Sequence, residues 1–130
     1  MIAQNAIPDV FILDLDRKEK HLVILSETHH LLRRFGQVEF VHMIKRKETD
    51  FSLREIADEI WSVVVGEVSF TLEDKREDSP SENQSMQVEL TGSHPQAVLI
   101  PFGVAYRIKT IKDSQLIRIT THADGIHEDD

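Results

Sequence analysis

The sequence predicts an all-β domain in which short strands close into a small barrel or sandwich. Short runs of β-branched and aromatic residues alternate with turn-forming residues along most of the chain. The strongest run, residues 60–72, is apolar on both faces at 63–65 and alternates between apolar and polar after Gly66, which is typical of a strand buried first on both sides and then on one. A chain of 130 residues is long enough for one hydrophobic core.

The individual strands follow from these runs and from the turns between them. We expect strands at residues 10–15, 21–25, 38–45, 60–72, 86–91, 97–100, 104–111 and 115–121. The charged residues 16–20 are expected to form a turn, and the polar residues 73–84, which include a Ser-Pro pair, an exposed hairpin connection. Residues 28–35 favour one helical turn. Residues 1–121 would form a single domain and residues 122–130 an acidic, mobile tail.

The segment before the strongest strand run is ambiguous. Ser52-Leu53-Arg54-Glu55 has the form of a helix capping box, and apolar residues recur at helical spacing over residues 53–60. Strand pairing with a distant segment can override such a local preference. A helix and a loop leading into a strand both stay open at this point.

Composition excludes several classes of partner. The chain has 15 Lys and Arg against 23 Asp and Glu, for a net charge of −8, and its basic residues are interspersed with acidic ones in the sequence, so no nucleic-acid partner is expected. It has no cysteine, which excludes disulfides and thiolate-bound zinc. The first residues lack the features of a signal peptide, and no run approaches the ~20 apolar residues of a membrane span. We expect a cytoplasmic protein with no membrane partner.

Two segments, each built around a glycine, resemble the two halves of the cupin barrel signature. Residues 59–68 have the sequence Glu-Ile-Trp-Ser-Val-Val-Val-Gly-Glu-Val, and residues 101–106 have Pro-Phe-Gly-Val-Ala-Tyr. The resemblance implies a cupin-type jelly-roll β-barrel with short helical turns. In such a barrel Gly66 would lie at a sharp bend of a strand, and Gly103 would take a positive φ in the turn after Pro101.

A longer stretch, residues 59–121, is similar to the dTDP-4-dehydrorhamnose 3,5-epimerase group of cupins. The likeness consists of a succession of motifs: Asp-Lys-Arg at 74–76, Ser-Pro at 79–80 and Pro-Phe-Gly-Val-Ala-Tyr at 101–106. It implies a protein related to enzymes that act on sugar nucleotides.

The resemblance also indicates which ligands and catalytic groups are missing. Metal-binding cupins supply three histidines and a glutamate; here Glu59 occupies the glutamate position, but the histidine positions fall near 52–53, near 54–55 and at Tyr106. Neutral imidazole suits divalent transition metals and a guanidinium does not, so we expect no metal and no cofactor. The epimerases use a histidine base, a lysine for the enolate-like oxygen and a tyrosine acid. Their lysine position falls on Glu59, and their histidine has no counterpart at matched spacing.

Five residues remain as candidates for a site in the barrel. Glu59 as base and Tyr106 as acid are the candidate catalytic pair, and Arg54, Trp61 and His42 are candidate ligand contacts. If Glu59 points inward, the alternation of a strand sends Trp61 inward as well. Trp61 and Tyr106 could equally be core residues, and His42 could be a satisfied histidine of the core or rim.

Two functional hypotheses follow. The first is a metal-free cupin that binds or isomerises a sugar nucleotide or small carbohydrate. The alternative is a non-catalytic interaction or regulatory module that keeps the barrel only for its shape, with an interior packed shut by Trp61, Tyr106, Phe40 and Phe70. Under both, we expect a homodimer in which the strands before residue 26 contribute to the contact.

Overall fold

The computed structural model describes residues 6–19, 22–25 and 34–123, and all regular elements in these ranges are strands. The helical turn expected at 28–35 lies almost wholly outside them. No helix in the described part of the chain has the length and hydropathy needed to cross a membrane.

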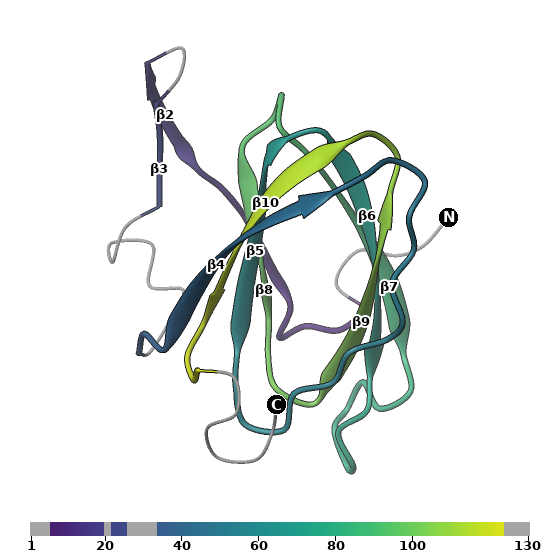
Figure 1. Cartoon of the computed structure of the whole chain (residues 1–130). Coiled ribbons are helices and arrows are strands. Elements are labelled where there is room, and N and C mark those ends of the chain that lie inside the picture. Colours follow the sequence, from purple (N-terminus) through teal and green to yellow (C-terminus); the bar gives the residue numbers. More distant parts are fainter. Residues whose placement is uncertain (1–5, 20–21, 26–33, 124–130) are drawn as a thin grey trace.

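The strands form two facing antiparallel sheets and a separate hairpin. In chain order they are β1 (Phe11–Asp14), β2 (Asp16–Glu19), β3 (Leu22–Ile24), β4 (Gln37–Met43), β5 (Glu59–Val65), β6 (Glu67–Asp74), β7 (Ser85–Thr91), β8 (Gln96–Ile100), β9 (Val104–Thr110) and β10 (Ser114–Thr120). One sheet has the order β1-β8-β5-β10-β4 and the other β7-β6-β9. Figure 1 shows β2 and β3 projecting from the barrel as a hairpin, whereas the sequence indicated only a turn at 16–20. The prediction of a jelly-roll β-barrel is confirmed.

Gly66 lies where the chain passes from the larger sheet to the smaller one. It separates β5 from β6, and its φ is +103°. A Cβ placed there would lie 2.3 Å from Ser114 Oγ and 2.5 Å from the carbonyl oxygen of Asp113. Glycine is therefore required both for the backbone conformation and for the close approach of the β9–β10 turn.

Aromatic side chains fill the space between the sheets. Trp61 on β5 contacts Phe70 on β6 and Tyr106 on β9 edge-on, with ring centroids 5.8 and 5.9 Å apart. These three rings are buried and make the interior a packed core. Phe40, which the second hypothesis placed inside, is 81% exposed on the outer face of β4, because strand alternation turns its neighbour Glu39 inward instead.

Residues 53–60 are not helical. The backbone amide and carbonyl of Ser52 both bond to Tyr106 of β9, at 2.7 and 2.9 Å. The carbonyl of Arg54 accepts from the amide of Gly103 at 2.8 Å, and β5 begins at Glu59. Long-range pairing thus overrides the local capping-box signal, and the loop alternative is the correct one.

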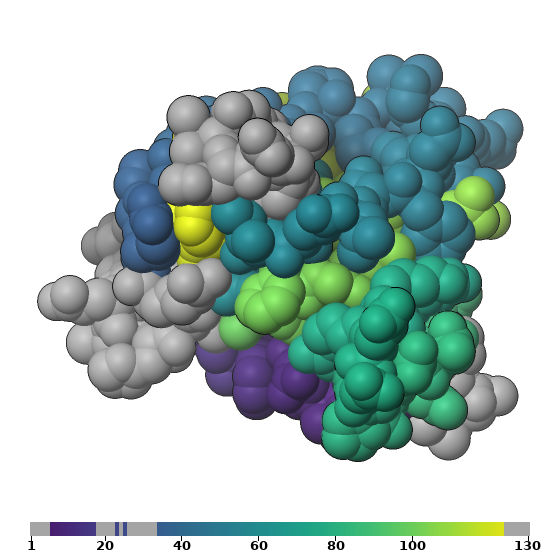
Figure 2. Space-filling model, turned by 90° about the horizontal axis from the view of Figure 1, so that it is seen from below, coloured from purple at the N-terminus to yellow at the C-terminus, as the bar shows by residue number. Residues whose placement is uncertain are grey.

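The connection between β6 and β7 is anchored at its base. The buried carboxylate of Asp74 accepts hydrogen bonds from Arg76 Nε at 2.9 Å, Ser79 Oγ at 2.9 Å and Ser81 Oγ at 2.5 Å. Arg76 also donates to Asp9 at 2.7 Å, which ties the connection to the N-terminal segment. In Figure 2 the connection lies beside that segment. The connection lies where the sequence predicted it, but its base is buried.

Candidate functional site

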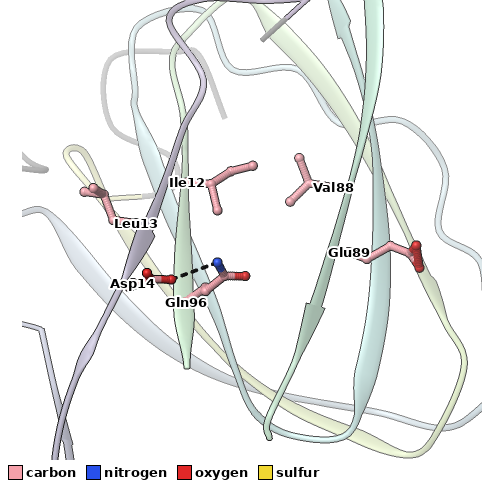
Figure 3. A pocket seen from close by; sticks show the side chains of 6 residues that line it. All are labelled: Ile12, Leu13, Asp14, Val88, Glu89 and Gln96. Carbon is pink, nitrogen blue, oxygen red and sulfur yellow. Dashed lines mark hydrogen bonds between the residues drawn. The ribbon is translucent and has the colours of Figure 1, made fainter. Parts of the chain in front are cut away.

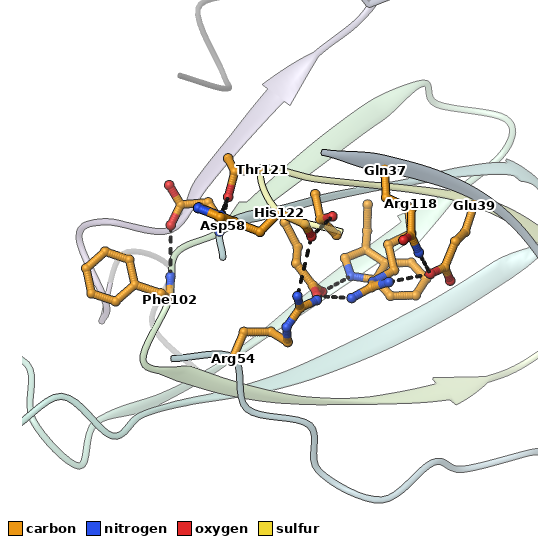
Figure 4. A network of polar contacts seen from close by, with 11 residues as sticks. Gln37, Glu39, Arg54, Asp58, Phe102, Arg118, Thr121 and His122 are labelled. Atoms are coloured by element: carbon orange, nitrogen blue, oxygen red, sulfur yellow. Dashed lines mark hydrogen bonds and ion pairs between the residues drawn. The ribbon is translucent and has the colours of Figure 1, made fainter. Parts of the chain in front are cut away.

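A buried carboxylate, Glu59, lies at the centre of a polar network inside the barrel. It is the first residue of β5 and is 1% exposed. Its Oε2 accepts from Arg54 Nη1 at 2.8 Å and from Arg118 Nη2, while its Oε1 accepts from Trp61 Nε1 at 3.0 Å. Figure 4 shows the two guanidinium groups converging from different elements. Two opposite charges and three hydrogen bonds offset the desolvation of the buried carboxylate.

The larger sheet positions Arg118 by its register. On β10, Arg118 is paired with Glu39 of β4 on one side and with Trp61 of β5 on the other. Directly paired residues project from the same face of a sheet. Arg118 Nη1 accordingly donates to Glu39 Oε2 at 2.5 Å, and Gln37 Nε2 donates to the same oxygen at 2.6 Å. The network therefore runs from the barrel centre to the half-exposed side chain of Glu39 at the sheet edge.

The other end of the network is closed by the residues after β10. Arg54 Nη2 donates to the carbonyl oxygen of His122 at 3.5 Å, and Thr120 Oγ1 donates to the same oxygen at 2.6 Å. The His122 Nδ1 lies 2.9 Å from Thr121 Oγ1, and the backbone amide of Asp58 donates to that hydroxyl at 2.9 Å. His122, which the sequence assigned to the tail, is buried here.

Tyr106 on β9 completes the centre. Burial, the charge of Glu59 and a hydrogen bond to Glu59 raise the pKa of the Tyr106 phenol far above its ordinary value, while Arg118 opposes this shift. Tyr106 is therefore a neutral phenol at physiological pH and can donate a hydrogen bond.

The structure brings together four of the five candidate residues. Arg54, Glu59, Trp61 and Tyr106 all line the same buried centre. His42 lies apart from them, exposed on the outward face of β4 and paired with Gln115.

Sequence reasoning missed Arg118 and Glu39. A signal for Arg118 was present: on β10, Leu116 and Thr120 share its face and are buried, so a charged residue between them is an inward charge that needs a partner. Glu39 carried no comparable signal, because the pairing of β4 with β10 joins segments about 80 residues apart.

A cavity of about 370 Å³ lies elsewhere, between the edge strands β1 and β7 with β8 beside them. It is lined by Ile12, Leu13, Asp14, Val88, Glu89 and Gln96 (Figure 3). Gln96 Nε2 donates to Asp14 Oδ1 at 2.9 Å. Hydrogen bonds from Gln96 and His94 hold the pKa of Asp14 below its ordinary value.

Within the described ranges, no three His, Cys, Asp or Glu side chains cluster in a way that could hold a metal ion. The four acidic and basic groups of the network instead neutralise one another: Arg54 and Arg118 balance Glu59 and Glu39.

The fold is a jelly-roll barrel of the cupin type. Among solved structures, the chain is similar to a dTDP-sugar isomerase from Desulfovibrio desulfuricans G20, with 20% identity, 92% of this chain and 82% of that chain covered, and a TM-score of 0.81. It is also similar to the epimerase RmlC of Legionella pneumophila in complex with dTDP-4-keto-L-rhamnose, with 20% identity, 95% and 72% coverage, and a TM-score of 0.78. The RmlC epimerase of Mycobacterium tuberculosis matches with 13% identity, 95% and 68% coverage, and a TM-score of 0.81.

Comparison with curated proteins gives a further relative. The chain is 26% identical over 93 residues to the spore coat polysaccharide biosynthesis protein SpsL of Bacillus subtilis, a match that covers 72% of this chain but only 62% of SpsL. No family model matches the chain. At these identities the structural likenesses establish the fold, and they confirm at that level the resemblance to dTDP-sugar isomerases and 3,5-epimerases.

Proposed function

We propose that the protein is a metal-free, cytoplasmic cupin that binds a sugar nucleotide or a related small carbohydrate at the buried centre of its barrel. The observation that carries this proposal is the contact between a neutral phenol, Tyr106, and a carboxylate, Glu59, flanked by the guanidinium groups of Arg54 and Arg118. The dTDP-sugar enzymes that share the fold support the choice of ligand class.

The geometry supports binding more directly than catalysis. An anionic ligand that entered the barrel would compete with Glu59 or Glu39 for a guanidinium, because both arginines already hold carboxylates. Once released from an arginine, Glu59 could act as a base while Tyr106 donates a proton to a ligand oxygen. Isomerisation therefore depends on a rearrangement of the ion pairs that accompanies binding.

The test is incubation with a panel of dTDP-4-keto sugars in deuterated solvent, with thermal unfolding and ligand deuteration as readouts. Binding raises the unfolding temperature, and isomerisation incorporates deuterium. Tyr106→Phe should abolish deuterium incorporation and keep at least part of the thermal shift. His42→Asn is the matched control on the outer face of β4 and should behave like the wild type. The absence of both a thermal shift and deuterium exchange with every sugar of the panel would remove the proposal.

A second candidate function, a non-catalytic interaction module, is favoured by the packing of Trp61, Phe70 and Tyr106 between the sheets. The central groups are also no more than 7% exposed. Under this alternative the barrel provides only a rigid shape, and the sugar panel gives neither a thermal shift nor exchange.

We also propose a homodimer formed through the outer face of the larger sheet. Phe40 and Val38 on β4 and Val64 on β5 are exposed apolar residues on this face. A contiguous exposed apolar surface is typical of a protein–protein contact. The β2–β3 hairpin, which projects from the barrel, is a second candidate element of the contact.

A further inference from the structure

Five cationic side chains lie on two segments that the fold places side by side. One segment is the turn after β4 and the other is β9; the residues are Lys45, Arg46, Lys47, Arg107 and Lys109. We call this set the basic edge. The amide of Arg46 donates to the carbonyl of Thr110 at 3.1 Å, and the amide of Thr110 donates to the carbonyl of Lys47 at 2.8 Å. Figure 1 shows the chain after β4 running alongside β9.

The basic edge lacks the ion pairs that other cations of this protein make. Elsewhere in the described ranges, Arg54, Arg76 and Arg118 pair with carboxylates in or near the core, and Lys75 and Lys112 pair with surface glutamates. Within those same ranges, no side chain of the basic edge forms an ion pair. The edge thus gathers five cations that form no ion pair with a described residue, on a protein whose net charge is −8.

Two neighbouring carboxylates do not change this. Asp113 accepts the backbone amide of Lys45 at 2.8 Å, and Glu48 faces Lys109 across an isolated β-bridge. Neither forms an ion pair with a described cation of the edge. The edge keeps its cationic groups available.

Arg107 is the most unusual member of the edge. Its guanidinium carbon lies 4.6 Å from the centroid of the Phe51 ring, which is 40% exposed. Its Nε is buried and has no hydrogen-bond partner in the described part of the chain. Stacking on Phe51 thus orients the guanidinium of Arg107, whose buried Nε has no acceptor among the described residues.

The turn that carries the lysines is held rigidly. Thr110 Oγ1 accepts the amide of Lys47 at 2.8 Å and donates to the carbonyl of Ile44 at 2.6 Å. Arg46 takes a φ of 60°, which fixes the sharp reversal after β4. A site that is already ordered loses less conformational entropy when it binds a ligand.

The basic edge is distinct from the barrel centre. Along β9 the side chains alternate between the two faces, so Arg107 and Lys109 point outward where Tyr106 points inward. Two residues apart, Arg107 and Lys109 project from the same face about 7 Å from each other.

We propose that the basic edge binds a phosphate-bearing polyanion, with Arg107 and Lys109 at its centre, Phe51 beside them and the 45–47 turn at one end. Several cations on adjacent segments favour an anion with more than one charge over a single carboxylate. Arginine matches the oxygens of phosphate with a planar fork, and lysine adds point charges. A nucleoside diphosphate and a polyphosphate chain share this chemistry.

The test is calorimetric titration at low salt with three probes: inorganic pyrophosphate, dTDP and long-chain polyphosphate. Wild-type protein should bind at least one probe saturably and lose affinity as salt is added. The double variant Arg107→Gln/Lys109→Gln should weaken that binding at least tenfold. Lys75→Gln, which removes a cation of the β6–β7 connection, is the matched control and should change it less than twofold. Equal weakening by the control, or no saturable binding at millimolar probe, would overturn the proposal.

Two further variants identify the source of the phosphate and the location of the site. Tighter binding of dTDP than of pyrophosphate, with the difference lost in Phe51→Leu, identifies a nucleotide stacked on the ring. Tighter binding of polyphosphate that is insensitive to Phe51→Leu identifies a polymer. Tyr106→Phe should leave pyrophosphate binding unchanged; its loss in this variant would place the anion in the barrel and overturn the proposal. Deuterium exchange with the sugar panel tests the barrel centre separately.

Discussion

Glu59 determines the electrostatics of the barrel interior. Its carboxylate is 1% exposed and accepts hydrogen bonds from Arg54, Arg118 and Trp61. Arg54 and Arg118 are each only 7% exposed, so water does little to stabilise their charges. Both guanidinium groups therefore depend on the shared Glu59 carboxylate for charge compensation. Under the proposed function, an anionic ligand has to displace these ion pairs before it can reach either arginine.

Removal of this charge should be strongly destabilising. Glu59→Gln keeps the size of the side chain but removes the negative charge that the buried guanidinium groups of Arg54 and Arg118 share, and we expect the free energy of unfolding to fall by roughly 3–5 kcal/mol. Urea denaturation measures the change. Glu55→Gln, at an exposed position of the same loop, should stay within about 0.5 kcal/mol of the wild type. Equal stability of the two variants would contradict the role assigned to Glu59.

Asp74 should make stability depend on pH in the acid range. Hydrogen bonds from Arg76, Ser81 and Ser79 hold the pKa of the folded Asp74 carboxyl well below the ~3.9 of an unfolded chain, against the opposing effect of burial. The unfolded state therefore takes up this proton first, so the stabilisation is complete above about pH 5 and declines as the pH falls through 4 and below. Unfolding of wild type and Asp74→Asn between pH 6 and 3 should show a smaller decline in the variant. An equal decline in stability with falling pH for wild type and Asp74→Asn would disprove that Asp74 causes this pH dependence.

At the scale of the elements, the bend at Gly66 joins the two sheets. Because β5 and β6 belong to different sheets, every pairing of β6 depends on the chain turning at this residue. Its φ of +103° and the close approach of Ser114 leave no room for a side chain.

Gly66→Ala should therefore destabilise the fold by more than about 1 kcal/mol, since it combines an unfavourable φ with a steric clash. Thermal or urea unfolding measures the loss. Ser69→Ala, on the outward face of β6 and paired with Glu89 and Lys109, is the matched control and should change stability little. An unchanged midpoint for Gly66→Ala would show that the bend tolerates a Cβ.

The sequence was sufficient where local pattern and tertiary structure agree. The sequence correctly located the bends at Gly66 and Gly103 from their turn chemistry. It was insufficient at residues 53–60, where an intact helix signal is overridden by pairing with β9. It also missed the partnership of Arg118 with Glu39, which exists only because β10 lies between β4 and β5.

At the scale of the whole molecule, the outer faces of the two sheets differ. The outer face of β6 carries Glu67, Ser69, Thr71 and Glu73, whereas that of β4 carries Val38 and Phe40. An antiparallel sheet with one face on the core normally exposes polar residues on the other. The contrast supports a partner on the β4 side.

The proposed homodimer predicts a mass near twice that of the 15.0 kDa chain in analytical ultracentrifugation. Phe40→Glu should shift the protein to monomer, because it buries a charge at the contact. Thr71→Glu, on the polar outer face of β6, is the matched control and should stay dimeric. A monomeric wild type, or a dimeric Phe40→Glu variant, would refute the contact.

The order of strands in the larger sheet also constrains synthesis in the cell. The strand β10, the last in chain order among those described, lies between β4 and β5, and its Arg118 joins Glu39 to Glu59. Chains still emerging from the ribosome thus lack the Arg118 guanidinium that joins Glu39 to Glu59, and they expose the unpaired edges of β4 and β5 until residues 114–120 arrive. Such nascent chains are prone to aggregation, so this barrel should close only after translation of its final strand, and C-terminal truncation before residue 114 should yield insoluble protein.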